Sequence, residues 1–123
     1  NPAYDLVSLI DDVRIETSLS LKKKIFKFYL KKSPKIFREK VQEFKNDFNI
    51  LSIQRNLKIL GIFYRLFKRD KKIKYLKFMP YTWKLIELRS KDDVFKNLKL
   101  LLNKAVSKKL RKQKIFKWNL KEL

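Results

Sequence analysis

The chain lacks histidine and cysteine and contains a single glycine, Gly61, in 123 residues. Without cysteine it forms neither a disulfide framework nor a thiolate metal site, so a reducing compartment is allowed. Without histidine it lacks the side chain that most often gains and loses a proton near neutral pH. One glycine also excludes the glycine-rich loops that surround phosphate groups. These absences leave few residues from which a catalytic site could be built.

A long apolar stretch is absent as well. The longest one runs from Ile59 to Tyr64 with Gly61 inside it, whereas a helix that spans a bilayer needs about 20 apolar residues. We therefore expect no transmembrane helix, no signal peptide ahead of the domain and a cytoplasmic location. The chain opens on Asn1 and its only methionine is Met79, so we expect it to be a piece of a longer protein.

Positive charge is present in large excess. The chain has 33 lysine and arginine residues against 12 acidic ones, a net charge of +21. Such an excess is typical of proteins that bind nucleic acid or anionic membranes. However, lysine greatly outnumbers arginine here, and lysine, isoleucine, phenylalanine and asparagine are the residues that AT-rich codons encode. We attribute much of the charge to codon usage and expect only weak, nonspecific binding of polyanions.

Apolar residues are numerous enough for a folded core. They make up 45% of the sequence, and a domain of this length buries roughly two-thirds of its unfolded surface. Every readable segment repeats its apolar residues with a period near 3.6, and none alternates with a period of two. The expected fold class is therefore all-α.

Local signals mark where the first helices start. Pro2 suits the first position of a short helix, and Ser18 or Ser20 can cap a second helix that extends to Leu30. Ser33 followed by proline predicts a hydroxyl N-cap and a proline at the first position of a third helix.

The third helix either continues through residues 52–70 or bends at residues 46–49, and a loop at residues 70–72 ends it. Later helices are expected to start at Pro80 and at Asp92 or Asp93. The basic tail, residues 106–123, is expected to be partly helical or frayed. Its apolar anchors are Leu110, Ile115, Phe116, Trp118 and Leu120.

The segment 52–70 reads as a central helix. On a helical wheel its apolar arc covers more than half the circumference, so more than one neighbour must cover it. Gly61 lies at the edge of the arc, where a close backbone approach would offset its low helix propensity. Asn56 falls inside the arc and is expected to be a buried amide, with Gln54 and Arg55 beside it. The basic strip opposite is expected to be solvated: Lys58, Arg65 and Arg69.

Carboxylates are the remaining candidates for chemistry. Asp11-Asp12 and Asp92-Asp93 are adjacent pairs, which point apart on a helix and suit caps or first-turn charges better than catalytic dyads. Asp5 lies among apolar neighbours in the first helical turn. It can accept backbone N–H bonds from a nearby loop, or it is an ordinary first-turn aspartate favoured by the helix dipole.

Two segments carry a family resemblance. "NPAYDLVSLIDDVR" (residues 1–14) and "QRNLKILGIFYRLFKRD" (54–70), followed by Tyr75-Leu76 and the run 80–83, resemble the C-terminal helical part of the aminoglycoside phosphotransferase-like kinases. Within that family they are most similar to the bacterial cell-wall sugar kinases of N-acetylmuramate and N-acetylglucosamine. The resemblance covers about residues 1–105 and implies a helical subdomain like the C-terminal lobe of a protein-kinase-like fold.

The resemblance also implies which parts of such a kinase are missing. The catalytic aspartate, the metal-binding aspartate and the nucleotide lobe would precede this chain, so ATP and Mg²⁺ are implied for the complete enzyme only. Asp5 matches the acid that supports the catalytic loop in this family. The family often has an acid where Asn1 stands and a glycine where Lys71 stands. We therefore expect neither a charge role for Asn1 nor a tight left-handed turn after Asp70.

Three functional hypotheses follow. The leading one is a C-terminal fragment of an amino-sugar phosphotransferase that is inactive alone and partners the missing N-terminal portion. It would contribute acceptor-pocket walls through Gln54, Arg55 and Asn56, without catalytic or metal-binding residues of its own. The second is a basic helical module that binds nucleic acid through the lysine clusters at 22–24 and 108–117. The third is a structural interaction module without a ligand.

Overall fold

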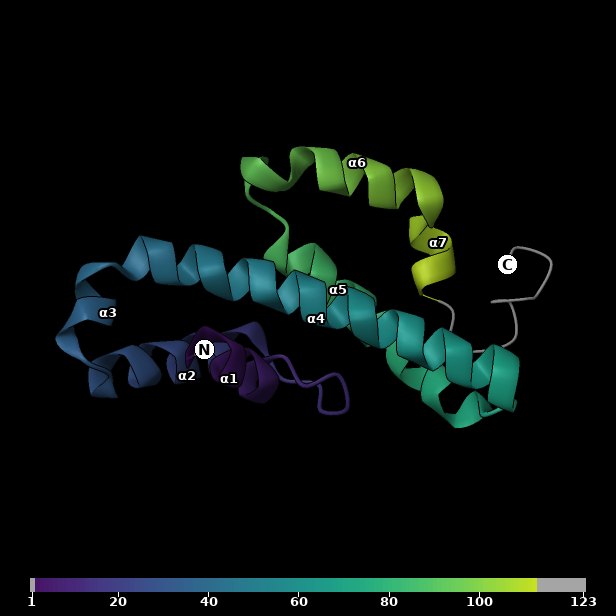
Figure 1. The fold of residues 1–123 in the computed structure, drawn as a ribbon, viewed down its shortest axis with the longest axis horizontal. Helices are drawn as coiled ribbons and strands as arrows, with labels where there is room; N and C mark the ends of the chain where they lie inside the picture. Colours follow the sequence, from purple (N-terminus) through teal and green to yellow (C-terminus); the bar gives the residue numbers. More distant parts are fainter. Residues whose placement is uncertain (1, 113–123) are drawn as a thin grey trace. The chain divides into compact units, whose positions relative to one another are not determined.

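The computed structural model describes residues 2–112 of the chain, without the side chain of Phe37 (Figure 1). Asn1 and the tail anchors Ile115, Phe116, Trp118 and Leu120 lie outside the described residues, as do the lysines of the second cluster beyond Lys112. The residues from 2 to 112 fold into α-helices and 3₁₀ turns without a strand, so the expected all-α class with a long central helix is confirmed. They form two compact units that divide between Ser52 and Ile53.

The first unit is built around short helices. Its elements are α1 (Pro2–Ile10), α2 (Leu19–Lys32), α3 (Lys35–Glu39) and the first part of α4 (Val41–Asp70). Helices α1 and α2 pack against each other, and the ring of Phe26 lies 5.7 Å from that of Phe44 and 5.4 Å from that of Phe48. The buried core of this unit comprises Ala3, Leu6, Val7, Ile10, Leu30, Phe44 and Phe48.

Two of the expected helix starts in this unit are confirmed. Helix α1 begins at Pro2. The hydroxyl of Ser18 accepts a hydrogen bond from the backbone N–H of Leu21 at 3.1 Å, which satisfies one of the unpaired donors at the start of α2.

The expected cap at Ser33 is wrong. Ser33 ends α2 instead, because its hydroxyl donates to the carbonyl of Tyr29 at 2.6 Å and its N–H donates to the carbonyl of Leu30. A residue that precedes proline is driven out of the α-region, and Ser33 accordingly adopts an extended conformation with ψ 163°. Pro34 therefore occupies the N-cap of α3 rather than its first helical position.

Helix α4 is not interrupted at residues 46–49. The interruption lies earlier, at Lys40, whose φ of −113° and ψ of 44° separate α3 from α4. From Val41 the helix is continuous to Asp70. The third helix expected from Ser33-Pro34 is therefore divided at Lys40, so neither alternative is observed in full, and the part from Val41 runs without interruption through residues 52–70.

A left-handed turn ends α4, contrary to expectation. Lys71 has φ 57°. Its N–H donates to the carbonyl of Phe67 at 3.1 Å, while the N–H of Lys72 donates to that of Leu66 at 3.0 Å. The bond from Lys71 is that of the αL motif, and the two bonds together satisfy terminal carbonyls of the helix, which compensates for a lysine where glycine is preferred.

The second unit packs around the rest of α4. It contains η1 (Ile73–Phe78), α5 (Met79–Arg89), η2 (Asp93–Phe95), α6 (Lys96–Ala105) and α7 (Lys108–Arg111). The ring of Phe63 stacks on that of Tyr75 at 5.7 Å and lies 6.0 Å from that of Phe78, which fixes η1 against α4. The buried apolar residues of this unit are Ile53, Leu60, Phe63, Leu76, Met79, Trp83, Leu85 and Ile86.

The expected signals of the second unit are partly confirmed. Pro80 lies in the first turn of α5, and the side chain of Asp92 accepts a bond from the N–H of Val94 at 3.1 Å. The prediction that another backbone segment lies close to Gly61 is wrong. Gly61 faces solvent, and apart from its chain neighbours and the backbone of its own helix turns no described atom would lie within 4 Å of a Cβ at this position.

Within residues 2–112 no helix combines the length and the apolar character that crossing a bilayer requires.

Candidate functional site

Asp5 lies in the first turn of α1, where its carboxylate is exposed. A negative charge is favourable there because the unpaired N–H groups of a helix start carry partial positive charge. The two neighbours of Asp5 differ in solvent exposure, since Tyr4 is 44% exposed and Leu6 is buried. The exposed carboxylate of Asp5 is therefore accessible to a segment outside the described residues. Its expected role in supporting a catalytic loop stays a prediction.

The three expected acceptor-pocket residues are consecutive in α4, and their side chains enter different environments. Gln54 is exposed, Arg55 is half-buried and Asn56 is fully buried. Successive side chains on a helix point about 100° apart, which explains this gradient. Asn56 therefore occupies the apolar arc as expected.

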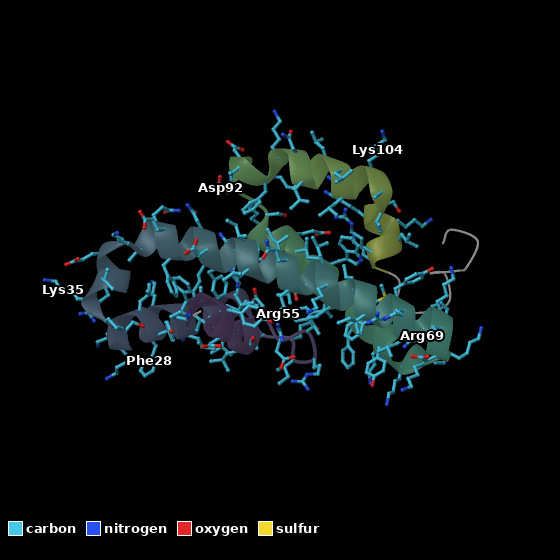
Figure 2. The ribbon with its side chains drawn as sticks, in the orientation of Figure 1. Phe28, Lys35, Arg55, Arg69, Asp92 and Lys104 are labelled. Carbon is cyan, nitrogen blue, oxygen red and sulfur yellow. The ribbon has the colours of Figure 1, made fainter. Side chains whose placement is uncertain are left out.

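Arg55, whose side chain is labelled in Figure 2, has a hydrogen-bond donor that is not used within the described residues. Its Nη1 is buried and has no hydrogen-bond partner among residues 2–112. A guanidinium carries five N–H donors in a rigid fork, so Arg55 can donate to an oxygen-rich ligand.

A buried polar cluster that the sequence did not predict lies in the first unit. The ammonium of Lys22 donates to the carbonyl of Ile10 at 2.7 Å and to Oδ1 of Asp11 at 3.2 Å. The hydroxyl of Ser52 donates to Oδ2 of Asp11 at 2.7 Å. Asp11 and Ser52 are 0% exposed and Lys22 is 4% exposed. The cluster joins the end of α1 to α2 and to α4.

This cluster stabilises the fold, because its charged groups are paired with one another inside the core. A charge removed from water is tolerated only when it is paired and hydrogen-bonded, and the Lys22 ammonium and Asp11 carboxylate meet both conditions. The interpretation of Asp11 as a cap or first-turn charge is therefore wrong. Its neighbour Asp12 remains at the surface side of the turn and pairs with Arg14 at 3.0 Å.

A signal for the cluster was present in the sequence. Each of its three polar residues lies four positions from an aromatic or aliphatic residue that belongs to the core or packs against it, which is the spacing of one helical stripe. Asp11 follows Val7, Lys22 precedes Phe26 and Ser52 follows Phe48. Polar residues in such positions must be buried with partners or must end the stripe, and here all three are buried together.

Burial of Lys22 also weakens the nucleic-acid hypothesis. The first lysine cluster, residues 22–24, was expected to face a polyanion, but Lys22 is withdrawn into the core while Lys23 and Lys24 are exposed. A phosphate backbone is contacted by accessible cations. The first cluster thus offers two accessible ammonium groups.

The side chains of residues 2–112 do not form a metal site. In the described part of the chain, no group of three acidic side chains could hold a metal ion. The whole sequence contains one glycine and no histidine.

Comparison with known proteins gives a partial match to a kinase. The chain is 30% identical over 106 residues to an N-acetylmuramate/N-acetylglucosamine kinase of Caulobacter vibrioides, which covers 86% of this chain and 28% of the kinase. The chain thus spans little more than a quarter of the length of that relative. No family model matches the chain, and no solved structure matches it. The chain is similar to part of a sugar kinase.

Proposed function

We propose that this chain is the C-terminal helical part of an ATP-dependent amino-sugar phosphotransferase. It contributes walls of the acceptor pocket and support for the catalytic loop, and it transfers no phosphate by itself. The observation that carries the proposal is the 30% identity to the kinase along 86% of this chain. ATP and Mg²⁺ bind to the preceding part of the complete enzyme, because phosphoryl transfer requires a metal cradle and a positioned base.

Two structural features support the assignment of roles. Arg55 is half-buried in the middle of α4 and has an unused Nη1 donor among the described residues, which suits a sugar hydroxyl or carboxylate. Asp5 presents an exposed carboxylate at the start of α1, which suits hydrogen bonding to backbone N–H groups of a preceding loop. Gln54 and Asn56 complete the acceptor side at positions next to Arg55.

The decisive experiment begins with the gene. The DNA upstream of Asn1 should encode an open reading frame with a His-x-Asp catalytic loop. An in-frame start close to Asn1 with no such loop would overturn the proposal.

Activity is then measured on the complete protein. With ATP and Mg²⁺ it should phosphorylate N-acetylmuramate or N-acetylglucosamine, with the product followed by ³¹P NMR, whereas the 123-residue chain alone should not turn over ATP above background. Magnesium-dependent turnover by the purified chain, retained after repeated purification, contradicts the proposal, as does a complete protein without activity on amino sugars.

Variants in the complete protein separate the two roles. Arg55→Ala should raise KM for the acceptor, because it removes a group that binds substrate and transition state alike, whereas Asp5→Asn should lower kcat more than it raises KM. Lys58→Ala, an exposed residue on the basic strip of the same helix, is the matched control and should leave both constants unchanged. A raised KM with unchanged kcat in Asp5→Asn would reject the supporting role.

A further inference from the structure

The second unit contains a cleft lined by α5, α6 and α7. Its volume is about 160 Å³, and its polar lining consists of Glu87, Ser90, Lys99, Asn103, Lys108 and Arg111. Three of these six side chains are cationic and one is a carboxylate, so the lining carries an excess of positive charge. None of them belongs to the acceptor-pocket residues proposed above.

Arg111 is the central residue of the cleft. Its side chain is 4% exposed, and the guanidinium lies 4.6 Å from the centre of the Trp83 ring. Its Nε donates to the carbonyl of Val106 at 3.1 Å and its Nη1 donates to Oε1 of Glu87 at 3.1 Å. These contacts hold the guanidinium plane in a fixed orientation.

The other terminal nitrogen of Arg111 is unused. Nη2 is buried and has no hydrogen-bond partner among the residues that the structure describes. A buried donor without a partner is unfavourable, since it has lost its bonds to water and gained none in exchange. An acceptor that enters the cleft would remove this deficit.

The remaining lining favours an anionic acceptor. Lys99 on α6 is half-buried and Lys108 on α7 is exposed, so two ammonium groups lie on the same cleft as the guanidinium. The side-chain amide of Asn103 adds a neutral donor. Guanidinium and ammonium groups together recognise phosphate oxygens, the guanidinium through its planar fork and the ammonium as a point charge.

The size of the cleft limits the ligand to a single group. Pockets that enclose drug-sized molecules have volumes of about 300–1,000 Å³, well above the volume found here. We propose that the cleft between α5, α6 and α7 binds a phosphate dianion, either inorganic phosphate or the phosphate group of a small monoester, through Arg111, Lys99 and Lys108. This inference does not rest on the proposed kinase function.

Fluorescence of Trp83 provides a direct test. Trp83 and Trp118 are the two tryptophans of the chain, so Trp118→Phe leaves Trp83, which contacts Arg111, as the single reporter. Titration with sodium phosphate at constant ionic strength should give a saturable change in emission, and sodium chloride should give none. Glycerol phosphate in a parallel titration distinguishes a free ion from a monoester group.

Matched variants show whether the site is the cleft. In the same background Lys99→Ala should weaken phosphate binding about tenfold, because it removes a charged hydrogen-bond donor. Lys104→Ala removes the same charge from an exposed position on the same helix that does not line the cleft (Figure 2) and should leave binding unchanged. Arg111→Lys keeps the charge, removes the fork and should weaken binding.

Equilibrium dialysis with radiolabelled phosphate measures occupancy independently of the fluorescence signal. One bound phosphate per chain, with affinity reduced about tenfold in Lys99→Ala and unchanged in Lys104→Ala, supports the site. Equal losses in the two lysine variants, equal responses to phosphate and chloride, or no saturable binding would each overturn it. Kinase activity plays no part in these readouts, so failure here and failure of the proposed function are distinguishable.

Discussion

The ammonium of Lys22 lies 3.2 Å from the carboxylate of Asp11, and the two side chains are 4% and 0% exposed. The hydroxyl of Ser52 binds the other oxygen of the same carboxylate at 2.7 Å. A charged pair is thus built into the core of the first unit, where each member depends on the other.

Replacement of Lys22 should destabilise the chain strongly. Lys22→Met keeps much of the side-chain volume but leaves the Asp11 carboxylate buried without its cation, which costs about 3–5 kcal/mol. The free energy of unfolding, measured in urea, should fall by that amount. Lys23→Met, at an exposed position, should change it by no more than about 0.5 kcal/mol. Equal effects of the two variants would show that the buried pair does not stabilise the fold.

Replacement of Gly61 should stabilise the chain. A Cβ at this position has open space around it and the backbone is helical, so Gly61→Ala should raise the free energy of unfolding by about 0.5–1 kcal/mol. Leu60→Ala, at the buried neighbour, should lower it by about 2–5 kcal/mol. A lower stability of Gly61→Ala would reveal a close neighbour of Gly61.

The left-handed residue at the end of α4 offers a second stabilising change. Lys71 adopts φ 57°, a conformation that costs a residue with a Cβ about 1–2 kcal/mol. Lys71→Gly should therefore raise the thermal midpoint of unfolding. Lys72→Gly provides the control, because φ −87° at Lys72 suits any residue and the added freedom of the unfolded chain should lower the midpoint. The opposite order of the two midpoints would contradict the assigned turn.

The pKa of Asp70, the last residue of α4, should depend on Arg69. A hydrogen bond from Arg69 is the main cause that lowers the pKa of Asp70 below its ordinary value, and the charges of Arg69, Lys72 and Arg65 add to it. Because the folded-state pKa is the lower one, the interaction stabilises the fold above the unfolded-state pKa of about 3.9. That stabilisation is lost as the pH falls through the folded-state value.

Carboxyl NMR titration checks this relationship. Arg69→Ala should raise the pKa of Asp70, whereas Arg38→Ala, which removes a cation that bonds carbonyls near Ser33, should leave it unchanged. An unchanged pKa of Asp70 in Arg69→Ala would show that the ion pair is absent in solution.

Binding of nucleic acid should be weak and nonspecific. Exposed lysines are spread over α2, α4, α5, α6 and α7, so DNA and RNA should bind by counterion release, with a Kd of about 10⁻⁴–10⁻⁶ M at physiological salt. Fluorescence anisotropy with several unrelated oligonucleotides at two salt concentrations measures this. Nanomolar affinity for one of them that survives the higher salt, and is lost in Trp118→Ala, would indicate a dedicated nucleic-acid module.

Features with a local physical cause could be predicted from the sequence. Pro2, Ser18, Pro80 and Asp92 mark helix starts because each acts on the backbone of its own turn. The apolar arc of residues 52–70 likewise identifies a central helix before any neighbour is known.

Features decided by competition or packing could not be predicted. The hydroxyl of Ser33 can form a hydrogen bond with the helix before it or with the helix after it, and in the structure it donates to the carbonyl of Tyr29 in the preceding helix. The turn at Lys71 depends on two backbone bonds that outweigh the preference for glycine. The helical spacing marks the polar residues of the Asp11 cluster, but which of them pair with one another is decided by tertiary packing, as is the Arg111 cleft.

The buried ammonium of Lys22 has a practical consequence for chemical labelling. Amine-reactive reagents require an accessible, deprotonated amine. They should therefore modify the exposed Lys23 and Lys24 quickly, whereas the buried Lys22 should react only when the first unit opens. The rate at which Lys22 is modified, compared with the rates at Lys23 and Lys24, therefore measures how often this part of the protein opens to solvent.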